Sequence, residues 1–131
     1  MNAALLLAGA LLFVAAAVHG LGGELLVVRR LSARALPSSP FGGPSMTKTM
    51  IGVTWHLTTI AFVELGILEI YAGVVSGGAS RGVELLAAGT ATAFAVLAIG
   101  AGLRHGPAAL LRHAGPLVLA IVAGLTWWGT V

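Results

Sequence analysis

Charged residues are scarce in this chain, and cysteine is absent. Lysine, arginine, aspartate and glutamate make up 8% of the 131 residues, whereas soluble domains carry about 25%. So few charges cannot cover the surface of an ordinary soluble globule. Low charge with high hydropathy also excludes an intrinsically disordered chain, and the lack of cysteine excludes a secreted scaffold held by disulfides.

The chain consists largely of long apolar segments. Hydrophobic residues account for 58% of it, and the mean hydropathy is +1.02. A helix needs about 20 apolar residues to cross a bilayer, so the chain has room for four spans. The apolar runs predict an all-α, antiparallel bundle of four transmembrane helices in one domain, over residues 3–28, 50–75, 83–103 and 107–130.

The connections between these runs are also readable. A cytoplasmic loop rich in proline and glycine is expected over 31–49, and a tight turn over 76–82, because both residue types interrupt helices. Pro116 is expected to bend the fourth helix, since proline removes one backbone hydrogen bond.

The placement of basic residues predicts the orientation. Only Arg81 belongs to the connection on the side of the termini; the other six flank the two remaining connections, and they are Arg29, Arg30, Arg34, Lys48, Arg104 and Arg112. The positive-inside rule then places both termini on the non-cytoplasmic side of a bacterial inner membrane. Cleavage of the first run as a signal peptide is an alternative, but no positive charge precedes it. The lipid bilayer is the expected partner, and the scattered charges do not form a stripe for nucleic acid.

Rows of small residues predict close helix packing, because small side chains let helices approach in lipid. The rows are Ala87, Ala91 and Ala95; Gly89 and Ala93; Gly73 and Gly77; and Ala120 and Gly124. They serve packing within one chain, or between chains of a homo-oligomer or a larger membrane complex.

Three ionisable residues fall in the inner half of the predicted bilayer on adjacent helices: His19, Glu24 and His56. At about 1.5 Å per residue, they lie roughly 14, 6 and 9 Å from the cytoplasmic ends of their helices. His19 and Glu24 are about 140° apart on a regular helix and do not share a face. Local unwinding at the glycines of 20–23 would change that angle.

Several interpretations of this group stay open. His19, Glu24 and His56 form a possible transition-metal site, and His19 and His56 alone are a possible pair of haem ligands. Alternatively, the histidines bond to each other, to Glu24 or to a backbone carbonyl and hold helices together. Glu24 alternatively pairs with Arg29 or Arg30 at the inner surface.

Glu64 lies deeper, and no basic residue lies at its depth. It is therefore expected to be protonated, hydrogen-bonded to a neighbour, or paired with another chain. Thr58 and Thr59 are expected to bond back to the carbonyl four residues earlier, with the lining of a polar seam as the alternative.

Three further charged residues are placed near the outer surface. Glu69 is expected there, together with an i,i+3 pair between Arg81 and Glu84, as a solvated rim that contributes little energy.

Two short motifs carry a resemblance. The residues H-G-L-G-G-E at 19–24 and W-H-L-T-T at 55–59 resemble an uncharacterised family of small bacterial four-span membrane proteins, in which HxxxGE ends the first helix and WHxTT begins the second. This chain departs from the pattern at Leu25 and Leu26, where a more polar pair is expected. The resemblance implies no activity, but it implies a feature shared by His19, Gly23, Glu24, Trp55, His56 and Thr59.

No catalytic motif stands out: the chain has no HExxH, no nucleophile elbow and no phosphate-binding loop, so an enzyme is not expected. The favoured function is a small structural or accessory subunit of a membrane assembly. One alternative is a haem- or metal-binding redox or sensor protein that uses His19 and His56. Another is a small transporter or proton pathway that involves Glu64.

Overall fold

The structure is a computed structural model that describes residues 1–40, 42–75 and 78–131. The turn predicted over 76–82 begins outside the described residues, as does Gly77 of the small-residue rows. Residues 78–82 are helical, so the helix predicted over 83–103 begins at Gly78 and the turn is shorter than expected. Within the described part, secondary structure is helical apart from one isolated bridge between Ser39 and Gly42. The prediction of an all-α chain is thus confirmed.

The first long helix has three parts: α1 (Ala3–Ala17), a π turn (Val18–Gly22) and α2 (Gly23–Leu26). Two short 3₁₀ turns follow it, over Val28–Arg30 and Ala33–Ala35. The remaining helices are α3 (Pro44–Val74), α4 (Gly78–Leu103), α5 (Pro107–Arg112) and α6 (Ala114–Gly129).

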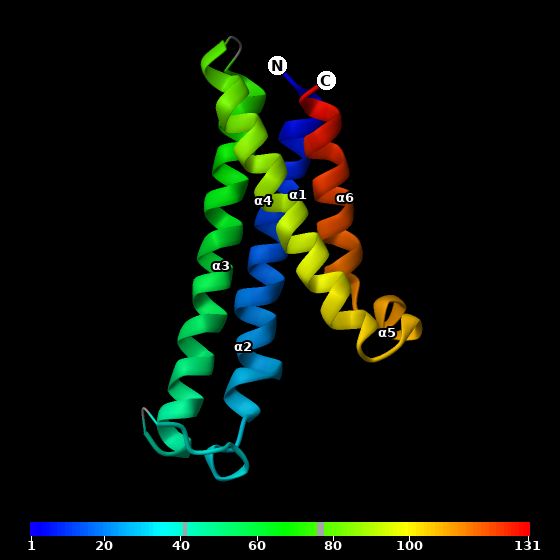
Figure 1. Ribbon diagram of the computed structural model, residues 1–131. Coiled ribbons are helices and arrows are strands. Elements are labelled where there is room, and N and C mark those ends of the chain that lie inside the picture. The colour runs from blue at the N-terminus through cyan, green and yellow to red at the C-terminus, as the bar shows by residue number, and fades with distance from the viewer. Residues whose placement is uncertain (41, 76–77) are drawn as a thin grey trace.

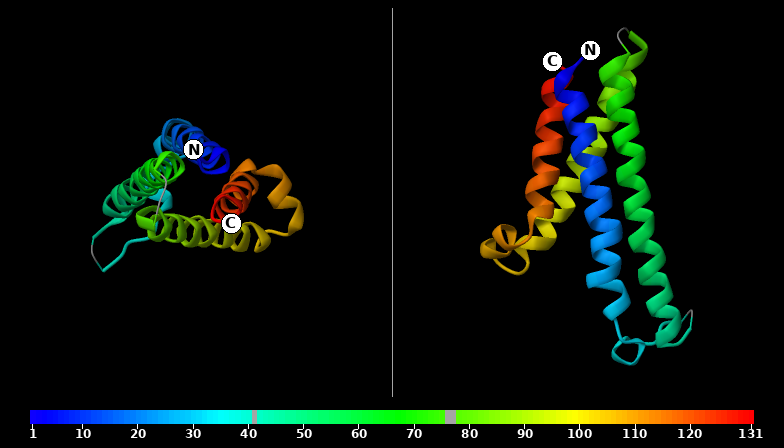
Figure 2. Two further views of the ribbon diagram at one scale, coloured as in Figure 1. Left: turned by 90° about the horizontal axis from the view of Figure 1, so that it is seen from above. Right: turned by 180° about the vertical axis from the view of Figure 1, so that it is seen from behind.

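The long helices run alternately up and down (Figure 1). Viewed along the bundle, they form a ring (Figure 2). In this ring α1 packs on α3 and α6, and α4 packs on the same two helices. The pair formed by α2 and α3 extends past the connection between α4 and α6 (Figure 1). The lower part of this pair is therefore left uncovered by the other two long helices.

Both termini lie side by side at one end of the bundle (Figures 1 and 2). Hydrogen bonds of Asn2 join α1 to α3 and α6 at this end. Its side-chain amide donates to the Gly129 carbonyl at 2.7 Å, and its backbone N–H donates to the Gly73 carbonyl at 2.7 Å. Its side-chain oxygen also accepts from the backbone N–H groups of Ala4 and Leu5, which caps α1.

The core is built largely from alanine and leucine. The row of Ala87, Ala91 and Ala95 is buried in it, so this row packs within the chain, whereas Gly89 and Ala93 face outward. The other members of the core are Ala8, Leu12, Ala16, Phe62, Leu65, Leu119, Val122 and Ala123. Small side chains let the helices approach closely where lipid supplies no drive for association.

Helix α3, which corresponds to the second predicted helix, begins earlier than its apolar run predicts. It starts at Pro44 rather than at residue 50, which shortens the preceding loop to 31–43. Proline interrupts a helix interior, but it fits the first turn, where its missing N–H has no helical partner to lose. The polar residues after Pro44 extend the helix beyond its apolar part.

The predicted fourth helix is two helices. The backbone is extended at His113, between α5 and α6, and Gly106 separates α4 from α5 at a φ of +91°. In a continuous helix the ring of Pro116 would clash with the carbonyl of Arg112, four residues earlier. The break at His113 removes this clash and leaves Pro116 in the first turn of α6, so the expected bend becomes a break.

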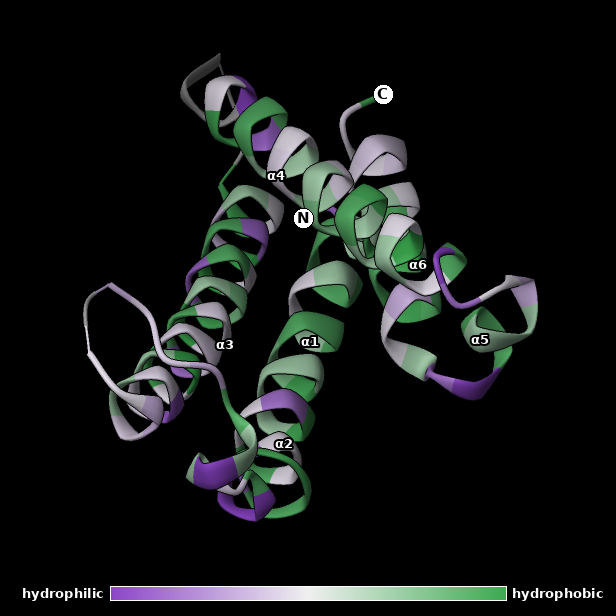
Figure 3. Ribbon diagram, turned by 60° about the horizontal axis from the view of Figure 1, so that its bottom comes forward, coloured by the Kyte–Doolittle hydropathy of each residue, from purple (hydrophilic) through white to green (hydrophobic). Residues whose placement is uncertain are grey.

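Three helices are long and apolar enough to cross a membrane, namely Ala3–Arg30, Pro44–Val74 and Arg81–Leu103. The helix α6, with 16 residues, is apolar but shorter. Figure 3 shows hydrophobic residues along the helices and hydrophilic residues gathered beyond α2 and around α5. The fold is therefore compatible with a multi-pass membrane protein.

Candidate functional site

A π turn positions the first two residues of the candidate site. Residues five apart stand one above the other in such a turn, because its hydrogen bonds join i to i+5. His19 and Glu24, which a regular helix would separate, are thereby both directed toward α3, where they meet Trp55 and His56. The local unwinding that would change the angle between His19 and Glu24 takes the form of this π turn, at Val18–Gly22.

Two glycines let α3 approach this turn. A Cβ atom on Gly23 would lie 2.3 Å from the Trp55 ring, and one on Gly20 would lie 2.8 Å from the Thr59 methyl carbon. A side chain at either position would have to displace the Trp55 ring or the Thr59 methyl group. The glycines therefore hold the two motifs of the sequence, at 19–24 and 55–59, against each other.

His19 is held by aromatic side chains of α3. Its ring stacks on Trp55 with centroids 4.4 Å apart and planes 8° from parallel. The rings of His19 and Phe62 are arranged edge to face, with centroids 5.5 Å apart. The Trp55 indole N–H donates to the His19 backbone carbonyl at 2.9 Å. The Nε2 atom of His19 is buried and has no hydrogen-bond partner in the described part of the chain.

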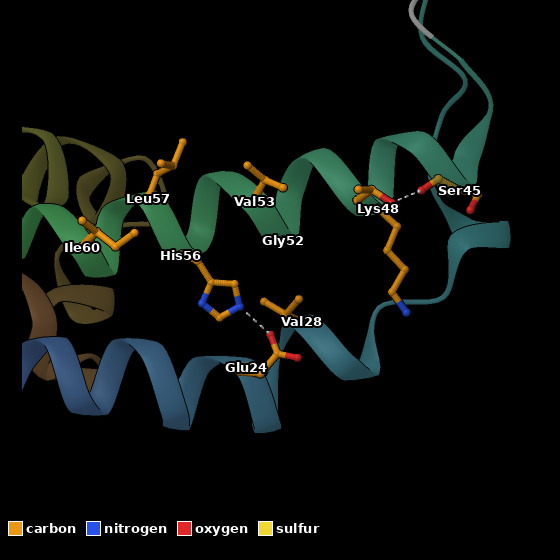
Figure 4. Close-up of a pocket in the computed structure, with 10 residues that line it drawn as sticks. Glu24, Val28, Ser45, Lys48, Gly52, Val53, His56, Leu57 and Ile60 are labelled. Carbon is orange, nitrogen blue, oxygen red and sulfur yellow. Dashed lines mark hydrogen bonds and ion pairs between the residues drawn. The ribbon is translucent and has the colours of Figure 1, made fainter.

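Glu24 contacts two nitrogen-bearing side chains, one at each carboxylate oxygen. Oε2 lies 3.3 Å from Nε2 of His56, and Oε1 lies 3.2 Å from Nε of Arg29. The pairing with Arg29 is one of the expected alternatives, and the contact with His56 is the expected interhelical bond (Figure 4). Because the His56 side chain is 52% exposed and that of Glu24 is 26% exposed, the pair contributes modestly to stability.

A groove lies on each side of the Glu24–His56 pair. One has a volume of about 580 Å³ and the other about 500 Å³. The larger is walled mainly by apolar side chains of α3 and by Val28, with Lys48 at its far end (Figure 4). The smaller runs along α1 and α3 past Gly20 and Thr59. Both open to the outside of the bundle.

The predicted metal triad is not assembled. In the ranges that the structure describes, no three His, Asp or Glu side chains converge on a point where a metal could bind. His19 packs into the aromatic cluster, while His56 turns to Glu24 and the grooves. The two imidazoles therefore do not form a joint ligand set with Glu24, and the arrangement gives no support to a haem held between them.

The threonines beside His56 make local bonds. Thr58 donates to the Thr54 carbonyl at 3.1 Å, and Thr59 donates to the Trp55 carbonyl at 3.3 Å. These are the expected bonds to the carbonyl four residues earlier. Such bonds occupy the hydroxyl protons, so neither threonine offers a free donor to the grooves.

The position of Glu69 differs from the one predicted from the sequence. Expected at a solvated rim, Glu69 is fully buried inside the ring of long helices, where its Oε1 lies 2.6 Å from the hydroxyl of Thr126 on α6 and its Oε2 has no described partner. Which side of α3 faces the inside of the ring cannot be read from depth along one helix. A threonine among the apolar residues of 114–129 was the available signal. The rim pair expected nearby is present, with Arg81 and Glu84 3.7 Å apart.

The hydrogen bonds of Thr126 bear on the protonation of Glu69. The hydroxyl lies 2.8 Å from the Val122 carbonyl as well as 2.6 Å from Glu69. A hydroxyl has one proton, and a carbonyl has none. Donation to Val122 therefore requires that Glu69 supply the proton of the other contact. A neutral Glu69 carboxylic acid accounts for both bonds.

Glu64 lies on the exposed side of α3. No hydrogen bond or ion pair joins its carboxyl to any part of the chain that the structure describes. It is separated from the Glu24–His56 pair and from the buried Glu69.

Comparisons with known proteins add no relative: no protein-family model, no curated protein and no solved structure matches this chain.

Proposed function

We propose that the chain is a four-span protein of the bacterial inner membrane that serves as a small structural or accessory subunit of a membrane assembly. One observation carries the proposal. At the end formed by α2 and α3, the Glu24–His56 pair is exposed on the outside of the bundle and lines two grooves there.

This exposure is unfavourable for a chain alone in lipid. Glu24 and His56 both belong to helices that are long and apolar enough to span a membrane. Ionisable side chains within such helices nearly always face protein or a water-filled cavity. A neighbouring subunit seated over the grooves would cover the pair and the apolar walls together. The open polar face is therefore what a subunit of a larger assembly needs.

The positions of the basic residues support both termini being outside. Four of them, Arg29, Arg30, Arg34 and Lys48, lie at or near the end where α2 and α3 meet the 31–43 loop. Arg104 and Arg112 flank the α4–α5 connection, which also lies away from the termini (Figure 1). The positive-inside rule assigns these connections to the cytoplasm.

Labelling of single cysteines tests this topology, because the natural chain has none. We expect Val131→Cys to react with a membrane-impermeant maleimide in spheroplasts, whose inner membrane is still sealed. Ser38→Cys, in the exposed loop, should react only after the membrane is permeabilised. The opposite pattern would overturn the orientation, and reaction of both cysteines from the same side of the membrane would contradict the four-span topology.

Native electrophoresis of membranes extracted in mild detergent tests the subunit role. We expect the chain to migrate in an assembly larger than a dimer of itself. Combining Glu24→Ala with His56→Ala should lower the assembled fraction by roughly fivefold, which corresponds to about 1 kcal/mol. Leu97→Ala, at an exposed position of α4, is the matched control and should change nothing. Migration only as a monomer or dimer would contradict the proposal.

The two alternative functions have less support. A haem or metal role retains one observation, the buried and unpartnered Nε2 of His19, without a second ligand beside it. Neither of the two grooves described above includes Glu64 in its lining, so they give no support to a transport role based on it.

A further inference from the structure

The outer face of α3 carries a regular seam. Nine positions from residue 46 to residue 74 follow one another at spacings of four and three residues, and all nine are exposed. Eight are apolar or aromatic, with 47% to 58% of each residue exposed. They are Met46, Met50, Val53, Leu57, Ile60, Ile67, Tyr71 and Val74, and the ninth is Glu64. Sustained over four heptads, this spacing is typical of a helix that packs along a second helix.

The seam faces away from the rest of the chain. Phe62, Leu65 and Glu69 are among the residues of α3 buried against its neighbours, and they lie on the other side of the helix. In Figure 4, Val53 and Leu57 point away from α2, whereas His56 points toward Glu24. The seam is thus separate from the contacts that build the bundle.

Glu64 makes the seam unsuited to lipid. It lies ten residues before Val74, which is about 15 Å along a helix and half of the roughly 30 Å hydrocarbon core. A carboxyl group there faces the middle of the bilayer with no partner from the described chain. Ionisable groups at this depth require a partner.

Symmetry identifies a partner that suits this carboxyl. Two copies inserted in the same orientation are related by a twofold axis along the membrane normal, so each residue of α3 faces its counterpart at the same depth. Glu64 then meets Glu64. Two neutral carboxyl groups each donate and accept one hydrogen bond, so the pair is complete without a basic residue. A single polar position in an apolar seam also sets the register of the two helices.

We propose that two copies of this chain associate through the outer seam of α3, with the two Glu64 side chains hydrogen-bonded across the twofold axis. The inference rests on the proposed membrane-spanning role and names one partner within the assembly. Three seam residues, Val53, Leu57 and Ile60, also wall the larger groove, so the seam dimer leaves only the smaller groove beside the Glu24–His56 pair available to a different subunit.

Cysteine cross-linking of the purified full-length chain in liposomes tests this interface. Ile67→Cys, next to Glu64 in the seam, should form disulfide dimers on oxidation, whereas Leu97→Cys, which is more exposed and lies on α4, should not. Equal cross-linking at the two positions, or none at Ile67→Cys, would overturn the proposal.

The role of the carboxyl is tested by diluting the Ile67→Cys chain with lipid. Glu64→Gln, which also donates and accepts, should keep the midpoint of dimer dissociation. Glu64→Leu should shift the midpoint by about tenfold toward monomer, as expected for an interhelical hydrogen-bonded pair. An unchanged midpoint for Glu64→Leu would remove Glu64 from the interface.

The same data separate this inference from the proposed function. A chain that stays monomeric in liposomes but migrates in a large assembly from native membranes refutes the seam dimer and leaves the subunit role standing. A chain that dimerises in liposomes and forms nothing larger in native membranes supports the seam and refutes the subunit role.

Discussion

Gly9→Leu is expected to force α1 and α3 apart and to lower the free energy of unfolding by about 3 kcal/mol, the upper part of the usual range for overpacking. A Cβ atom on Gly9 would lie 2.9 Å from the Gly66 carbonyl oxygen and 2.7 Å from Cγ1 of Ile70. The isoleucine side chain is able to turn away, but the carbonyl belongs to the backbone of a packed helix. The two helices must therefore separate, and contacts along both are lost.

The measurement is unfolding in mixed micelles with increasing denaturing detergent, followed by circular dichroism. Gly89→Leu is the matched control, because Gly89 faces outward on α4 and a Cβ there would meet no atom within 4 Å. Both variants exchange a helical glycine for leucine, so the gain in helix propensity is the same. Equal stability of the two variants would show that α1 and α3 do not approach closely at Gly9.

Glu69→Ala is expected to lower the free energy of unfolding by about 3 kcal/mol, because it leaves a cavity at a fully buried position of the bundle. Glu69→Gln should leave the free energy nearly unchanged. A glutamine amide donates to the Thr126 hydroxyl as a neutral carboxylic acid does, so Thr126 keeps its bond to Val122.

The same micelle unfolding assay decides the protonation of Glu69. If Glu69 were an ionised carboxylate, Glu69→Gln would remove a hydrogen bond to a charged group and lower stability by about 1.5 to 3 kcal/mol. Thr58→Ala is the control for the loss of a threonine back-bond on an exposed face of α3, and it should change stability by less than about 1 kcal/mol.

Helix type was predictable, and helix limits were less so. Long apolar runs indicate helices because a backbone in lipid must bond to itself, and Ala3–Arg30, Pro44–Val74 and Arg81–Leu103 meet that expectation. The limits near Pro44 and His113 differ from the prediction. The effect of a proline depends on its position within a helix, which the neighbouring turns decide.

The candidate site was predictable in its members but not in its contacts. The sequence placed His19, Glu24 and His56 on adjacent helices, and the structure pairs Glu24 with His56. It also predicted the pairing of Glu24 with Arg29 as an alternative. The stacking of His19 on Trp55 depends on the π turn and on the register of α1 against α3, and neither is encoded in the spacing of residues along one helix.

Glu64 and Glu69 show most clearly what each level of information decides. Five residues apart, they stand about 140° apart on a helix, so the sequence alone determined that they point in different directions. It also placed Glu64 within an apolar helix, where a carboxyl needs a partner, but it placed Glu69 at a solvated rim, which was wrong. Only the tertiary structure decided that Glu69 lies inside the ring of helices, beside Thr126, and that Glu64 lies on the outer face. The physical reason is that burial depends on which side of a helix its neighbours occupy, and that side is set by packing among segments far apart in the chain.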